Sequence, residues 1–143
     1  MIFSSYEFES AARTEQIKRI LAYAVYNPTE EHLGYILDTI YSGADARLFI
    51  LKSKIEVAGV IGLRQRGDEE AEILHIAVGQ TSRNQGIGRK LIAEAQLVSD
   101  VRRMVAETDR TAVGFYRRCG FAIQSLGEKY PGTERFWCVL REK

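Results

Sequence analysis

A single stretch near the middle of the chain combines a short apolar segment, a glycine-containing loop and an amphipathic segment. Residues 72–78 are rich in residue types that favour β-structure, which predicts a largely buried strand. From Ile87 onward, apolar residues recur at helical spacing and predict a helix. The first N–H groups of a helix lack intrahelical partners, and the helix dipole makes that end positive. Because Gly86 and Gly88 let a ligand approach the main chain and Arg83 adds a positive charge, the sequence predicts a phosphate site here.

Two common phosphate-binding patterns do not fit this loop. A dinucleotide-binding fingerprint requires a third glycine three residues after the second, where this chain has Leu91. A P-loop requires Gly-Lys-Ser or Gly-Lys-Thr at the helix start, and neither occurs in the sequence. The remaining pattern is Arg83-x-x-Gly86-x-Gly88, shortly after a strand that ends Ile-Ala-Val. It resembles the acetyl-CoA pyrophosphate loop of the GNAT superfamily of N-acetyltransferases.

A second segment carries the same resemblance. Residues 112–121 read Ala-Val-Gly-Phe-Tyr-Arg-Arg-Cys-Gly-Phe. They are similar to the family's A-x-x-F/L-Y-x-x-x-G-F segment, whose helix lies beside the thiol arm of the cofactor. The resemblance therefore covers the chain from about Ile55 to its end, and the residues before that match the family only in layout.

The order of predicted elements gives the fold class, α+β (mixed α/β), in one domain over residues 1–143. We expect a mostly antiparallel sheet of six or seven strands with helices on both faces and one strand–helix–strand crossover at the loop. The resemblance adds that the sheet is splayed at its central strand. Strands are predicted over residues 2–8, 46–51, 55–63, 72–78, 104–108, 121–126 and 135–140, helices over 14–26, 30–41, 87–99 and 111–119, and a loop over 128–133.

The resemblance implies acetyl-CoA as co-substrate and assigns the residues that bind it. The strand would pair its main chain with the amides of the pantetheine arm, and the N–H of Ile76 would polarise the acetyl carbonyl. The loop and the helix start would hold the pyrophosphate. The expected binding residues are Ile76, Ala77, Val78, Arg83, Asn84, Gln85, Gly86, Ile87, Gly88 and Arg89.

Acetyl transfer to an amine requires removal of a proton from the amine, because lysine-like groups have a pKa of about 10.4. The resemblance makes Glu72 a candidate catalytic base, since several family members carry a glutamate there. Its other interpretation is a solvated strand-end carboxylate. The rival bases are His75 and Glu107. The ordinary pKa of a histidine, about 6.5, suits the task, although a histidine in an apolar strand is also typical of a protein core.

Tyr116 is the predicted proton donor to the departing thiolate. A phenol is protonated at neutral pH, and in the family the matching tyrosine hydrogen-bonds the cofactor sulfur. The alternative is an aromatic packing residue. Cys119 lies at the C-terminal end of a predicted helix, where the dipole does not lower the pKa of a thiol, so direct transfer in a ternary complex is expected instead of an acyl-enzyme.

Composition narrows the function classes. The net charge of +1 gives no electrostatic case for binding nucleic acid or an acidic membrane, and no apolar run is long enough to span a bilayer. The N-terminus lacks the pattern of a signal peptide, and Cys119 and Cys138 are too few for a disulfide framework, so we expect a cytoplasmic protein. With only His32 and His75 beside them, no metal site is expected.

The first interpretation is thus an N-acetyltransferase that acts on a small-molecule or peptide amine, with acyl-chain preference and acceptor left open. The resemblance also allows a homodimer formed through edge strands. A second interpretation is a non-catalytic acyl-CoA-binding sensor or scaffold. A third is a dinucleotide-dependent enzyme that uses Gly86 and Gly88, with Asp109 on the ribose, against which Leu91 argues.

Overall fold

The computed structural model describes residues 1–7 and 9–142. These residues form two compact units. The first consists of Met1–Arg64 and Ile73–Val98, and the second of Gln65–Glu72 together with the chain from Ser99 onward. The strands are hydrogen-bonded in the order β1-β2-β3-β4-β5-β7-β6, and β4 contributes residues to both units. The expectation of a single domain over residues 1–143 stays a prediction.

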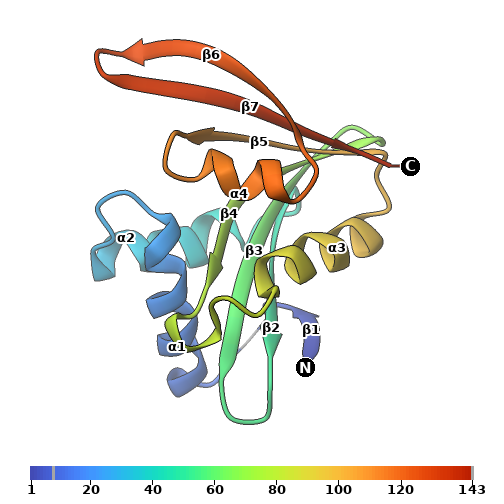
Figure 1. Ribbon diagram of the computed structural model, residues 1–143. Helices are drawn as coiled ribbons and strands as arrows, with labels where there is room; N and C mark the ends of the chain where they lie inside the picture. The colour runs from blue at the N-terminus through green and yellow to red at the C-terminus, as the bar shows by residue number, and fades with distance from the viewer. Residues whose placement is uncertain (8, 143) are drawn as a thin grey trace. The chain divides into compact units, whose positions relative to one another are not determined.

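The first unit holds most of the helices (Figure 1). Its strands are β1 (Ile2–Ser5), β2 (Ala46–Lys52), most of β3 (Val57–Arg66) and the second half of β4 (Glu70–Val78). Its helices are α1 (Ala11–Leu21), the 3₁₀ turn η1 (Ala22–Ala24), α2 (Glu30–Tyr35), the π turn η2 (Ile36–Ile40), the 3₁₀ turn η3 (Gln80–Ser82) and α3 (Ile87–Ser99). The β1–β2 and β2–β3 pairs are antiparallel.

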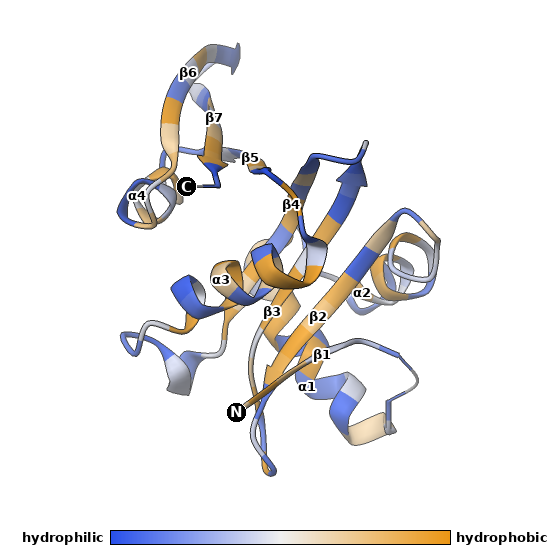
Figure 2. Cartoon of the chain, turned by 90° about the vertical axis from the view of Figure 1, so that its right-hand side faces the viewer, coloured by the Kyte–Doolittle hydropathy of each residue, from blue (hydrophilic) through white to orange (hydrophobic). Residues whose placement is uncertain are grey.

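Alternate residues of β3 bury against different helices of this unit. Val60 packs in a cluster with Ile17 of α1 and Leu33 of α2. At the neighbouring position, Gly59, an added Cβ would lie 2.9 Å from the Leu91 side chain of α3. Helices therefore cover both faces of the strands, which Figure 1 shows for α1 and α2 on one side of β3 and α3 on the other. The apolar colouring of β2 and β3 in Figure 2 reflects this burial on both faces.

The second unit consists of the first half of β4, then β5 (Arg103–Asp109), α4 (Val113–Arg118), β6 (Ala122–Tyr130) and β7 (Thr133–Arg141). The β4–β5 pair is parallel over Glu70–Glu72, whereas β5–β7 and β6–β7 are antiparallel. Met104, Phe121 and Cys138 are among its buried side chains. The predicted fold class, α+β with a mostly antiparallel seven-stranded sheet, is confirmed.

Several predicted boundaries were wrong. The first strand ends at Ser5, and the end of its predicted range, at Phe8, lies outside the described residues. The helix predicted over residues 14–26 occupies Ala11–Leu21, because the Ser10 hydroxyl accepts from the N–H of Arg13 and caps an earlier start. The second helix turns into a π turn after Tyr35.

The loop predicted over residues 128–133 is instead the end of a hairpin. Tyr130 pairs with Thr133, so that only Pro131 and Gly132 connect β6 to β7. Gly132 has a φ of +78°, and its N–H donates to the Glu128 carboxylate at 3.1 Å. A proline followed by a glycine with positive φ is typical of a type II turn, in which these two residues are enough to connect the strands.

Candidate functional site

The loop between β4 and α3 is tied down at its start and exposed at its centre. The N–H of Gly79 donates to the carbonyl oxygen of Ala58 at 2.7 Å, and the N–H of Ser82 donates to that of Gly79 at 2.9 Å. Ser82 is buried, whereas residues 83–86 are exposed. Asn84 has a φ of +62° and Gly86 a φ of +74°. An exposed tip on a fixed base suits the binding of a ligand by the main chain.

The first turn of α3 follows directly, and we call residues 83–89 the cradle. Ile87 and Gly88 are buried, which holds the helix start against the sheet, and the N–H of Lys90 donates to Gly86 at 3.0 Å. A Cβ added at Gly86 would meet no protein atom within 4 Å. The open space at this glycine and the positive end of the helix dipole suit an anion, and the phosphate site itself stays a prediction.

Arg83 has two neighbours within the first unit. Its Nε lies 3.5 Å from the carbonyl oxygen of Val78, which it faces as a long hydrogen-bond donor. Its guanidinium carbon lies 4.5 Å from the centre of the Tyr23 ring, a cation–π contact. Tyr23 belongs to η1, and nothing in its local sequence pointed to the cradle. The structure thus adds a residue that orients the predicted phosphate-binding arginine.

Tyr23→Leu is expected to weaken coenzyme A binding about two- to fivefold, because an exposed cation–π contact contributes about 0.5–1 kcal/mol. Tyr23→Phe retains the ring and should bind as the unchanged protein does. Pantetheine, which has no pyrophosphate, should bind all variants alike. Isothermal titration calorimetry measures these affinities, with Tyr26→Leu as the control at a tyrosine that is 94% exposed. An equal loss of pantetheine affinity in Tyr23→Leu would contradict a role through Arg83.

The β4 residues expected to contact the pantetheine arm lie immediately before this loop. Ile76 and Val78 are half-buried, and Ala77 between them packs in the core cluster under α1 and α2. His75 precedes them, and its Nδ1 lies 2.5 Å from the hydroxyl oxygen of Tyr41. Burial lowers the pKa of His75 to about 4, with the charge of His32 as the second cause. A neutral imidazole with so low a pKa is a weak base toward an amine at pH 7.

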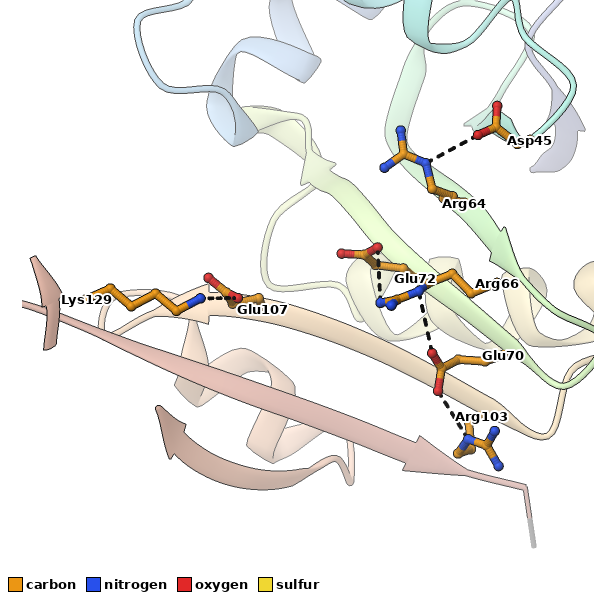
Figure 3. A network of polar contacts seen from close by, with 8 residues as sticks. All are labelled: Asp45, Arg64, Arg66, Glu70, Glu72, Arg103, Glu107 and Lys129. Atoms are coloured by element: carbon orange, nitrogen blue, oxygen red, sulfur yellow. Dashed lines mark hydrogen bonds and ion pairs between the residues drawn. The ribbon is translucent and has the colours of Figure 1, made fainter. Parts of the chain in front are cut away.

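In the second unit, Glu72 belongs to a row of alternating charges (Figure 3). Its Oε1 lies 3.6 Å from Arg66 Nη1, and the Arg66 Nε is 3.8 Å from the carboxylate of Glu70. Glu70 also accepts a hydrogen bond from Arg103 Nε at 3.2 Å. The Glu72 side chain is 24% exposed, so it remains reachable from solvent. The structure shows a partner for this carboxylate, Arg66, that the sequence did not indicate.

Glu107, the third candidate base, is held by two cations of the β6–β7 hairpin. Lys129 Nζ and Arg135 Nε donate to its two carboxylate oxygens, each at 3.0 Å. These hydrogen bonds lower the pKa of Glu107. A carboxylate that is stabilised in its charged form accepts a proton poorly, which disfavours Glu107 as the catalytic base.

Tyr116 lies on α4 and is 5% exposed. Its ring makes edge-to-face contacts with Phe115 and Phe121, at centroid distances of 5.3 and 5.2 Å. Burial raises the pKa of its hydroxyl, so the group stays protonated at neutral pH and can donate. Cys119 is half-buried after the end of the same helix. This placement fits both a proton donor and an aromatic packing residue.

Asp109 has a structural role at the end of β5. Its Oδ1 accepts hydrogen bonds from the N–H of Thr111 (3.0 Å), the hydroxyl of Thr111 (2.6 Å) and the N–H of Ala112 (3.1 Å). These contacts fix the turn that leads into α4. They occupy an oxygen that the dinucleotide interpretation would have used on a ribose.

Within the described parts of the chain, residues 1–7 and 9–142, no group of histidine, cysteine and acidic side chains has the arrangement of a metal site. Over the same residues, no helix has both the length and the apolar character needed to cross a bilayer.

Comparisons with known proteins establish the family of the chain. The model of the acetyltransferase (GNAT) domain matches residues 44–123, more than half of the 143 residues. The chain therefore belongs to the GNAT family of acetyltransferases, and the resemblance drawn from the cradle and from the segment at Tyr116 is confirmed.

The chain is similar to a curated relative from Bacillus methanolicus and to two solved structures. An uncharacterized N-acetyltransferase of the lysA 3′ region of Bacillus methanolicus is 26% identical over 97 residues, 66% of this chain and 79% of the relative. A crystal structure assigned to the GNAT family, from Desulfovibrio desulfuricans, has a TM-score of 0.82 at 19% identity and covers 98% of both chains. An aminoglycoside 6′-N-acetyltransferase complexed with coenzyme A has a TM-score of 0.80 at 15% identity, covering 99% of this chain and 97% of its own.

Proposed function

We propose that this protein transfers an acetyl group from acetyl-CoA to an amine by direct attack in a ternary complex. Acetyl-CoA is the co-substrate, and the family of the chain makes it an N-acetyltransferase. The observation that supports this most is the cradle, an exposed loop with positive φ at Asn84 and Gly86, at the head of the long helix α3. Main-chain N–H groups there, with Arg83, suit a pyrophosphate.

The roles of the remaining residues follow from the reaction. The amine nitrogen bonds to the thioester carbon, the carbon–sulfur bond breaks, and the amine gives up a proton. The main chain of Ile76 and Val78 orients the pantetheine arm, and the N–H of Ile76 polarises the acetyl carbonyl. Tyr116, protonated at neutral pH, gives its proton to the thiolate. The acceptor is a small-molecule or peptide amine, and cytoplasmic location and pairing of two copies stay predictions.

Glu72 is the proposed base, because several family members carry a glutamate at this position and its partly exposed carboxylate has one cation, Arg66, at 3.6 Å. Glu107 is held more tightly, by two cations at 3.0 Å. Glu72→Gln should lower kcat/KM about 10²-fold, because the amide of glutamine cannot take a proton from the amine. Arg66→Gln is the matched control variant, because it removes the ion pair and keeps the carboxylate of Glu72. An unchanged kcat/KM in Glu72→Gln would rule out Glu72 as the base and leave its ion pair with Arg66 a purely structural role.

Calorimetric titration with acetyl-CoA, coenzyme A and a nicotinamide dinucleotide, followed by a thiol-release screen over amines, tests the whole function. We expect coenzyme A and acetyl-CoA to bind, the dinucleotide not to bind, and at least one amine to release thiol from acetyl-CoA. Selective binding of coenzyme A without release from any amine would favour the sensor or scaffold interpretation. Selective binding of the dinucleotide would contradict the proposal.

A further inference from the structure

The first unit contains a buried tyrosine–histidine pair that the proposed chemistry leaves unused. The hydroxyl of Tyr41 lies 2.5 Å from His75 Nδ1, and the two rings meet edge to face. Tyr41 is 7% exposed and His75 is partly buried. Tyr41 comes from the end of η2 and His75 from β4, so 34 residues separate them in the chain. The fold thus brings the end of η2 against an imidazole nitrogen of β4.

The position of Tyr41 is fixed by its surroundings. Its N–H donates to the carbonyl oxygen of Ile36 at 3.2 Å, which is the five-residue hydrogen bond of a π turn. Its hydroxyl lies against Gly62 of β3, where an added Cβ would overlap it. Any side chain at position 62 would therefore displace the hydroxyl from His75. π turns of this kind occur frequently at functional sites.

Counting protons assigns the direction of the hydrogen bond. A hydroxyl can donate or accept, and so can Nδ1 of a neutral imidazole, depending on its tautomer. If Nδ1 donated, the hydroxyl proton of Tyr41 would need another acceptor, and none is found among residues 1–7 and 9–142. If Tyr41 donates, the hydroxyl proton of Tyr41 and Nδ1 of His75 each have a partner. His75 is then unprotonated on Nδ1 and carries its hydrogen on Nε2.

The charged groups around the pair favour two neutral partners. Burial lowers the pKa of His75, and the positive charge of His32 on α2 acts in the same direction. Burial raises the pKa of Tyr41 above its ordinary value, opposed only in part by Arg64 of β3. The folded protein therefore keeps Tyr41 protonated and His75 uncharged across the neutral range.

We propose that Tyr41 holds His75 as the neutral Nε2–H tautomer, and that His75 serves acetyl transfer as a hydrogen-bond donor and not as a base. The second half rests on the proposed function. His75 immediately precedes Ile76, and no residue in the described parts of the chain pairs with its Nε2. The recipient is an oxygen atom, either that of the acetyl carbonyl or one on the amine acceptor. Tyr41 is a positioning residue for this donor.

Nuclear magnetic resonance of the full chain with ¹⁵N-labelled histidine tests the tautomer. The chain has two histidines, and His32→Gln assigns the signal of the other. We expect His75 to show a protonated Nε2 and an unprotonated Nδ1 from about pH 8 down to about pH 5, since its pKa is about 4. Tyr41→Phe, which removes only the hydroxyl, should mix the two tautomers. A proton on Nδ1, or titration of His75 near pH 6.5, in the unchanged protein would overturn the assignment.

Two substitutions at His75 then distinguish a role as hydrogen-bond donor from a role as catalytic base. Glutamine keeps a donating N–H without basicity, whereas leucine keeps neither. We expect His75→Gln to retain kcat/KM within about tenfold and His75→Leu to lose roughly 10²-fold, which is typical for loss of one donor at a reacting oxygen. A loss concentrated in kcat indicates the acetyl carbonyl, and a rise in the KM of the amine indicates the acceptor.

Equal loss in His75→Gln and His75→Leu, with both variants folded, would overturn the donor role, because it is the result expected of a base. A failure of the tautomer assignment can be distinguished from a failure of the proposed function. If the unchanged protein acetylates no amine, the proposed function and the donor role both fail, whereas the tautomer is still decided by the ¹⁵N signals.

Discussion

Gly86→Glu is expected to abolish measurable binding of coenzyme A while leaving the protein folded. The added side chain would start in the open space of the cradle, where it meets no protein atom, and would place a carboxylate where the pyrophosphate is proposed to bind. Juxtaposed like charges cost several kcal/mol, so the affinity should fall at least 100-fold. The left-handed φ of +74° adds a strain of about 1–2 kcal/mol, which a folded domain tolerates.

Two controls isolate the charge from the strain. Gly86→Ala carries the strain alone and should lose far less affinity. Gly67→Glu carries the same charge at a φ of +73°, also in open space, in the turn between β3 and β4. It should bind coenzyme A as the unchanged protein does. Calorimetry and circular dichroism measure binding and folding, and normal affinity in Gly86→Glu would place the pyrophosphate outside the cradle.

Tyr116→Phe is expected to lower kcat about 10²-fold while the affinity for acetyl-CoA changes less than twofold. The substitution removes the hydroxyl that is proposed to protonate the thiolate, and a general acid contributes a factor of about 10²–10⁴. It keeps the ring and its contacts with Phe115 and Phe121, so the fold should persist. Because burial raises the pKa of Tyr116, its ionisation should not set the alkaline limit of the rate in the unchanged protein.

Thiol release under saturating acetyl-CoA measures kcat, and calorimetry measures the affinity. Tyr26→Phe removes the hydroxyl of a tyrosine that is 94% exposed and should leave both quantities unchanged. If Tyr116→Phe turned over at the normal rate, Tyr116 would be an aromatic packing residue and the proton would come from elsewhere.

The strand–loop–helix around the cradle could be predicted from the sequence because its signals are local. The helix predicted over residues 87–99 is α3, and the strand predicted over residues 72–78 lies within β4. Apolar spacing, glycine positions and the preceding arginine are all readable within about twenty-five residues. The Pro131-Gly132 turn was also local, but it was interpreted as part of a longer loop.

The partners of the candidate residues could not be predicted, because tertiary packing brings them together. Tyr41 reaches His75 only because η2 adds a π turn and Gly62 leaves room for the hydroxyl. Tyr23 lies far from Arg83 in the chain, yet its ring lies under the guanidinium. No periodicity or motif encodes such pairs, although the proposed roles of His75 and Arg83 depend on them.

The hydrogen bonds at Asp109 make the turn before Tyr116, the proposed proton donor, sensitive to acid. Three donors converge on one oxygen of this carboxylate and lower its pKa, and they fix the turn before the helix that carries Tyr116. A carboxylate whose pKa is lower in the folded than in the unfolded protein stabilises the native state at pH values above the unfolded-state pKa. That contribution is lost as the pH falls through the folded-state pKa. Strong acid would therefore remove this contribution and weaken the turn that leads into α4 and Tyr116.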